Sequence, residues 1–370
     1  MSEIYTSSEP MDNLMVLCDV YGSRFPGTKG DLQSVKWMVK RLKKYGIKNA
    51  HYESYTIPGW KRGKATLRVT SPIKKDFDVI ALPHSIGAEI EAKLVFLGDG
   101  AVDDYEKRKE EIDGNIVLVT SRRPLGMQRL LHRTEKYVRS VLAGAKGWIF
   151  MNHYPAYGPP TGGISPIIPA VGISYEAGSF LVRLLKRSPD VTLKLKTAGR
   201  NLEIESYNVI CDIPGTSEDT EFVVAGSHYD GHDISQGAVD PASGAVTVME
   251  IARNLWKVRK QLKRRVRLIC FGAEETGLYG SYNYVAMHPD EMKDIRFMLN
   301  LDSGGRKGKK GLTFHDFPEL EPYLEKWAAE MKADMPSDQR ITPYSDHWPF
   351  FLKSVPCGSG GDPEDRRTRT

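Results

Sequence analysis

The sequence predicts an α/β protein: a mostly parallel central sheet with helices on both faces, interrupted by a β-rich inserted domain. Two observations lead to this prediction. After Glu203, apolar strand-like runs alternate with segments of helical length, a pattern typical of parallel sheets covered on both faces. Before it, between 71 and 198, strand-length runs alternate with turns and carry no cluster of potential ligand residues, which indicates a separate lobe. With 370 residues, the chain is long enough to form both.

The amino-terminal part, 1–70, is expected to begin the domain that holds the central sheet. From Asp31 to Leu42, apolar residues recur at helical spacing, and a glycine follows as a stop signal. The segments 51–57 and 65–69 alternate like strands on either side of a Pro-Gly turn.

The inserted domain is expected over 71–200 and the remainder of the sheet domain over 201–370. The same patterns of spacing and punctuation predict the elements of both parts. In the insertion they are strands at 92–97, 115–120, 148–151 and 168–173 and helices at 134–142 and 175–185. In the last part they are strands at 206–213, 221–227, 266–271 and 297–301 and helices at 242–260 and 278–287.

Composition excludes several classes of protein. Lys plus Arg (52) exceed Asp plus Glu (47) by only five, and the basic run 257–267 lies at a helix carboxyl end, so we expect a solvated turn and no nucleic-acid partner. No apolar run approaches the roughly 20 residues that span a bilayer, and 1–10 lacks the features of an export signal. The four cysteines are far apart, as expected for reduced thiols in a cytoplasmic protein.

Imidazole and carboxylate side chains follow the predicted strands. His228, the pair Glu274-Glu275 and Asp302 each come within a few residues of a strand's last apolar residue. Sites in parallel sheets lie at the carboxyl ends of the strands, where these side chains would meet. Together with Asp240 and His347 they have the composition of a divalent metal site in a hydrolase.

Single residues leave alternatives open. Asp230 shares a face with His228 in an extended chain, so its carboxylate can accept the second imidazole N–H. Asp240 could bridge two ions or only cap the following helix. Of the adjacent acids Glu274 and Glu275, one can bind metal while the other serves as general base. His347 could be a core residue.

Taken together, the motifs resemble those of the co-catalytic zinc exopeptidases, the family of bacterial leucyl aminopeptidases and glutamate carboxypeptidases. The middle lobe resembles the protease-associated domain that several members insert. The matching segments are Gly22–Gly27, His228-Tyr-Asp230, Gly237–Gly244, Phe271–Gly277, Asn300-Leu-Asp302 and Ser345–Phe350.

The resemblance implies the zinc exopeptidase fold and two Zn²⁺ ions, with Co²⁺ or Mn²⁺ as alternatives. One ion would be held by His228 and Asp302, the other by Glu275 and His347, with Asp240 bridging them. Glu274 would be the general base, with Asp230 in the catalytic set beside it.

The function implied is that of a metallo-aminopeptidase, which hydrolyses the N-terminal residues of peptides through a two-metal-activated water. A carboxypeptidase or amide hydrolase on the same scaffold, or an inactive binding or scaffold relative, is the alternative. The expected partner is a peptide substrate, with neither nucleic acid nor membrane, and a homo-oligomer is compatible with the resemblance.

Two departures from the family stand out. Many members have Asp-Asp or Asp-Asn, joined by a cis peptide, where this chain has Asp240-Pro241, and proline lowers the cost of cis to under about 1 kcal/mol. We therefore expect a cis bond here. Members also continue further past the last histidine, so the end of this chain, 358–370, looks shortened.

Overall fold

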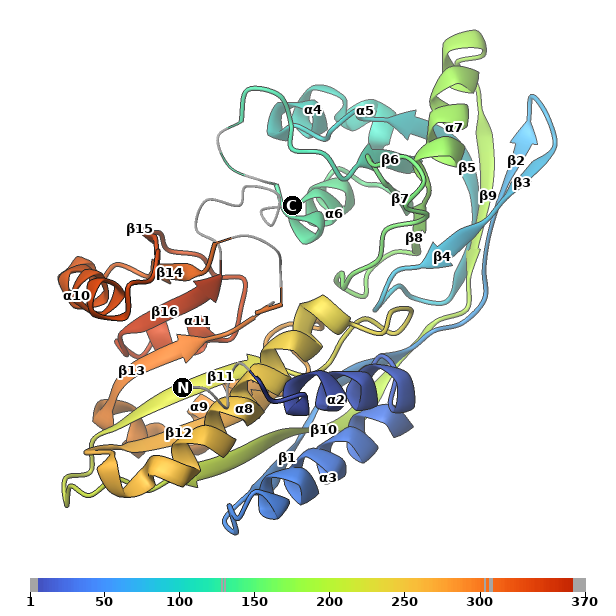
Figure 1. Cartoon of the computed structure of the whole chain (residues 1–370). Coiled ribbons are helices and arrows are strands. Elements are labelled where there is room, and N and C mark those ends of the chain that lie inside the picture. Colours follow the sequence, from blue (N-terminus) through green and yellow to red (C-terminus); the bar gives the residue numbers. More distant parts are fainter. Residues whose placement is uncertain (1–5, 128, 130, 303, 306–308, 362–370) are drawn as a thin grey trace. The chain divides into compact units, whose positions relative to one another are not determined.

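A computed structural model of the chain describes residues 6–127, 129, 131–302, 304–305 and 309–361. These residues form two compact units: unit 1 comprises the chain up to Ile57 and again from Ile204, and unit 2 comprises Pro58–Glu203. Each unit is built on one sheet (Figure 1). The segment 362–370, part of the end expected to be shortened, lies outside the described residues, as do 1–5.

The sheet of unit 1 is mixed, with a parallel centre. Its strands are β1 (His51–Lys61), β10 (Arg200–Ile213), β11 (Phe222–His228), β12 (Arg265–Phe271), β13 (Ile295–Asn300), β14 (Gly311–Phe314), β15 (Ser337–Gln339) and β16 (Cys357–Gly361). They are hydrogen-bonded in the order β1-β10-β12-β11-β13-β16-β14-β15. The neighbours β12, β11, β13 and β16 run parallel, whereas β10 and β14 pair antiparallel with β12 and β16. This arrangement confirms the predicted mostly parallel sheet.

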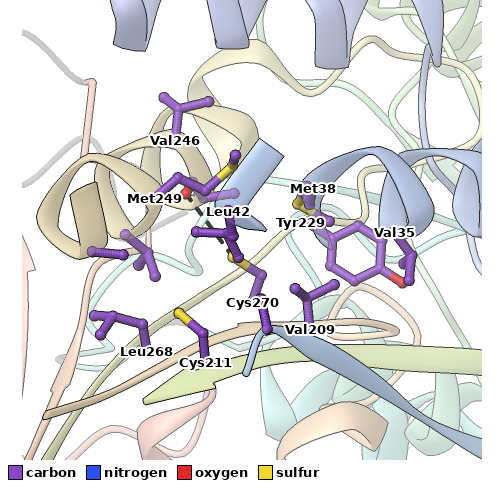
Figure 2. Close-up of a cluster of buried hydrophobic side chains, with 14 of the residues drawn as sticks. Val35, Met38, Leu42, Val209, Cys211, Tyr229, Val246, Met249, Leu268 and Cys270 are labelled. Atoms are coloured by element: carbon purple, nitrogen blue, oxygen red, sulfur yellow. Dashed lines mark hydrogen bonds between the residues drawn. The ribbon is translucent and has the colours of Figure 1, made fainter. Parts of the chain in front are cut away.

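Helices cover both faces of this sheet because its strands alternate apolar residues between the faces. Cys211 and Cys270 point to the face covered by α3 (Lys29–Lys44) and α8 (Ser243–Val258), where they pack in the cluster of Figure 2. Ile210 points to the other face, which α9 (Tyr279–Met287) and α11 (His347–Phe351) cover. All four cysteines are buried free thiols. The helical segments are α2 (Glu9–Met15), η1 (Val16–Val20), α3 (Lys29–Lys44), η2 (Ala238–Ala242), α8 (Ser243–Val258), η3 (Arg259–Gln261), α9 (Tyr279–Met287), η4 (Pro289–Asp294), η5 (Pro318–Leu320), α10 (Glu321–Met331) and α11 (His347–Phe351).

Unit 2 is a smaller β-rich domain. Its strands are β2 (Ala65–Ser71), β3 (Lys75–Phe77), β4 (Val79–Ala81), β5 (Ala88–Phe96), β6 (Ile116–Thr120), β7 (Gly147–Met151), β8 (Ala170–Ile173) and β9 (Thr192–Thr197), and its helices are α4 (Val102–Lys107), α5 (Lys109–Ile112), α6 (Arg133–Leu142) and α7 (Tyr175–Arg187). Strands β5 to β8 are parallel and carry one core on each face, as the fully buried β6 and β7 require. Among the residues described in both units, no helix has the length and apolarity needed to cross a bilayer.

Candidate metal centre

Three strand ends of unit 1 meet at one edge of the sheet. His228, the last residue of β11, pairs with Phe271, the last residue of β12, and Gly226 of β11 pairs with Asn300, the last residue of β13. The segments that leave these strands therefore start side by side. They carry His228, Glu274 and Asp302 to a common place, as expected for residues that follow neighbouring parallel strands.

The imidazole of His228 is the centre of this cluster. Its Nε2 lies 3.3 Å from Asp240 Oδ1, 3.4 Å from Asp302 Oδ1 and 3.9 Å from Glu274 Oε2. Buried, Nε2 makes no hydrogen bond to any described residue. Tetrahedral zinc at about 2.0–2.1 Å from nitrogen and oxygen keeps its ligand atoms about 3.3–3.4 Å apart. His228 Nε2 thus lies at the spacing of zinc ligands from Asp240 and from Asp302, and the ligand atoms of His228, Glu274 and Asp302 all lie within 4.8 Å of one another.

Electrostatics favour a cation at the same place. Burial lowers the pKa of His228, but the nearby carboxylates of Glu274 and Asp302 outweigh it and raise that pKa well above its usual value. Burial also raises the pKa of Glu274, an effect that His228 opposes and Glu275 reinforces. Several carboxylates lie around one buried imidazole, and a divalent ion bound among them would stabilise their negative charge.

Asp230 contacts the cluster differently from our expectation. The backbone carbonyl of Asp230 lies 3.0 Å from His228 Nδ1, whereas its carboxylate is 3.6 Å from that atom. The carboxylate instead accepts the backbone N–H groups of Glu274 at 3.0 Å and Glu275 at 3.2 Å. Asp230 therefore orients the imidazole through its main chain and fixes the acidic pair through its side chain.

Asp240 enters the cluster from a sharp bend before α8. The Asp240-Pro241 peptide bond is cis, as predicted. The beginning of α8 lies close to the sheet, because a Cβ atom at Gly244 would come within 2.2 Å of the Leu301 carbonyl and 2.3 Å of Ser227 Oγ. This close approach places the segment that carries Asp240 over the ends of β11 and β13.

The two residues expected to hold a second ion, Glu275 and His347, each have a protein partner. Glu275 Oε2 lies 2.9 Å from His232 Nε2. His347 Nε2 lies 2.9 Å from the Thr342 carbonyl, and its ring stacks on His315 with centroids 3.8 Å apart. Burial lowers the pKa of His347 to about 4, so the ring is neutral and donates to that carbonyl. The structure thus assembles the half-site around His228 and leaves the Glu275–His347 half unassembled.

Arg24 lies within the Gly22–Gly27 motif but was not among the predicted site residues. Its guanidinium is fully buried and donates to five backbone carbonyls. The acceptors are Tyr229 at 2.6 Å, Leu17 and Gln236 at 3.0 Å, Gly237 at 3.1 Å, and Gly22. Arg24 therefore ties together the segments that present His228 and Asp240. In the sequence, the only hint of this role is that a charged arginine stands among the turn-forming residues of Gly22–Gly27.

Comparison with known proteins supports a peptidase assignment. The model "Peptidase family M28" matches residues 208–368, and the PA domain model matches 90–181. Carboxypeptidase Q from Xenopus laevis is 25% identical over 304 residues, which are 79% of this chain and 64% of that protein. Aminopeptidase YwaD from Bacillus subtilis is 30% identical over 302 residues, which are 80% of this chain and 61% of that protein. The chain therefore spans less than two thirds of the length of these curated relatives.

Solved structures show the same fold. The crystal structure of BSAP, a zinc aminopeptidase from Bacillus subtilis, matches with a TM-score of 0.76 and 25% identity, over 97% of this chain and 86% of that one. The matches in sequence and in structure indicate the same family as the sheet and the cluster at its strand ends. The chain belongs to peptidase family M28 and carries a PA domain between the two parts of its peptidase unit.

Proposed function

We propose that the protein is a zinc-dependent exopeptidase, an aminopeptidase that removes N-terminal residues from peptides with two ions at its centre. The observation that carries this proposal is the buried His228 Nε2, which faces Asp240 and Asp302 at the spacing of zinc ligands. The relatives named as aminopeptidases, one of them a zinc aminopeptidase, support the substrate and the metal.

The candidate residues have two roles, metal binding and proton transfer. His228 and Asp302 would hold one ion, Glu275 and His347 the other, with Asp240 shared between them. His347 has to leave the Thr342 carbonyl to take part. Zinc ions, when bound, lower the pKa of water and polarise the scissile carbonyl. Glu274, beside His228, accepts the proton of the attacking water and delivers it to the leaving amine.

A carboxypeptidase is the second candidate because carboxypeptidase Q matches a similar share of the chain. The metal centre sets the chemistry, while the pocket around it sets which end of the substrate is accepted.

One tetrapeptide in three forms separates the candidates. We expect the zinc-loaded chain of 370 residues to release the first residue of the free and the C-amidated peptide and to leave the N-acetylated peptide intact, as read by mass spectrometry. Release of the last residue from the acetylated form would establish the carboxypeptidase instead. Failure to cleave any form with zinc bound would remove the exopeptidase proposal.

Zinc is also expected to stabilise unit 1. Binding to the folded state alone adds about 4 kcal/mol to the free energy of unfolding when free zinc exceeds its Kd by about 1,000-fold. Thermal unfolding with and without a chelator measures the shift. His228→Gln should lose most of it, and an equal shift in this variant would show that zinc binds elsewhere.

A further inference from the structure

A second histidine lies beside the acidic pair. His232 Nε2 is 2.9 Å from Glu275 Oε2, and the two side chains are 22% and 16% exposed. The other ring nitrogen, Nδ1, is buried and has no hydrogen-bond partner among the described residues. Since Nε2 must carry the proton to bond a carboxylate, the ring acts as a donor to Glu275.

The loop that follows β11 thus holds Glu275 at two points. The Asp230 carboxylate accepts the backbone N–H of Glu275 at 3.2 Å, and His232 contacts the Glu275 side chain. His228, Asp230 and His232 are spaced two residues apart, so one short segment presents an imidazole to the metal cluster, a carboxylate to the backbone of the acidic pair and a second imidazole to its side chain. Glu275 is consequently fixed in both main chain and side chain.

We propose that His232 is a positioning residue that fixes the Glu275 carboxylate for binding a divalent cation. This inference rests on the proposed function, in which Glu275 is a metal ligand. With Oε2 held by His232, the carboxylate keeps one orientation, and Oε1 is the oxygen that would bind the ion. Carboxylate ligands in metal sites are themselves hydrogen-bonded, and loss of such a partner typically weakens metal binding by about 10–100-fold.

The test is calorimetric titration of the metal-free chain of 370 residues with Zn²⁺, supported by absorption spectra with Co²⁺. In His232→Phe, which cannot donate to Glu275, the affinity of one ion should fall by about 10–100-fold while that of the other stays unchanged. His232→Gln, whose amide N–H can replace the donor, should bind both ions close to wild-type strength. If His232→Phe does not fold, His232→Asn, which is too short to keep the contact, takes its place.

The chain offers a matched control. His288 Nε2 lies 3.0 Å from Glu53 Oε2, with side chains 22% and 18% exposed, so this pair resembles His232–Glu275 in geometry and burial. It precedes η4, which leads into the amino end of β13, away from the strand ends that carry the metal cluster. His288→Phe should therefore leave both zinc affinities unchanged.

Unchanged zinc binding in His232→Phe, or an equal loss in His288→Phe, would overturn the inference. So would a His232→Gln variant as weak as His232→Phe, because the donor would then be irrelevant. A wild-type protein that binds two zinc ions and cleaves no peptide would refute the proposed function, while the metal titrations would still decide the role of His232.

Discussion

Glu274→Gln is expected to retain zinc and to lose at least about 99% of turnover, because a positioned general base contributes about 10²–10⁴-fold. Glutamine keeps the size of the side chain and its capacity for hydrogen bonding but cannot take up a proton from water. The Glu274 carboxylate lies 3.9 Å from His228 Nε2 and is mostly buried, which suits a group that handles protons beside the ions. Zinc content by mass spectrometry and initial rates on the preferred peptide give the two readings.

Glu275→Gln is the matched comparison, since it makes the same change one residue further on. It should weaken one zinc ion rather than turnover alone. The structure makes the comparison necessary: His228, Glu274 and Asp302 offer ligand atoms that all lie within 4.8 Å of one another, and Glu275 is outside this group. Loss of zinc in Glu274→Gln, with activity restored by added metal, would exchange the two roles.

Arg24→Met is expected to cause the largest loss of stability, at least about 4 kcal/mol. The substitution removes a donor from five backbone carbonyls, of which Gly237 keeps the N–H of Ala242 as a partner. Each buried acceptor left without a partner costs about 1–3 kcal/mol. Because whole domains are stable by only about 5–15 kcal/mol, unit 1 should be close to unfolding. Hydrogen exchange in chelator should show the loss in peptides from 222–242, with unit 2 peptides as an internal reference.

Arg41→Met serves as the control on the same unit. Arg41 pairs with Glu9 at 2.6 Å near the surface, and pairs of this kind contribute about 0–1 kcal/mol. Arg24→Lys, which keeps the charge but not the fork of donors, should fall between the wild type and Arg24→Met. Equal losses in Arg24→Met and Arg41→Met would contradict the claim that Arg24 ties the two segments together.

The order of the elements and the place of the cluster were accessible from sequence. Strand alternation, such as Val209, Ile210 and Cys211, encodes which face each side chain buries, and this pattern is local. The positions of His228 and Asp302, each after a predicted strand, are likewise encoded locally in the sequence. In a parallel sheet, strand ends at one edge bring these side chains together whatever the loops do.

What the sequence by itself determined is therefore the α/β sheet with helices on both faces, the β-rich unit, and the meeting of His228, Asp240, Glu274 and Asp302. Only the tertiary structure decided which partner each polar atom takes. Arg24 reaches Tyr229 across 205 positions of sequence. The Asp230 carboxylate accepts the backbone N–H groups of Glu274 and Glu275 and not the imidazole N–H of His228. The imidazole that contacts Glu275 is that of His232, whereas His347 contacts the Thr342 carbonyl. Hydrophobic periodicity records burial, which repeats along an element, whereas a hydrogen bond between loops depends on a single approach in space that leaves no periodic trace in the sequence.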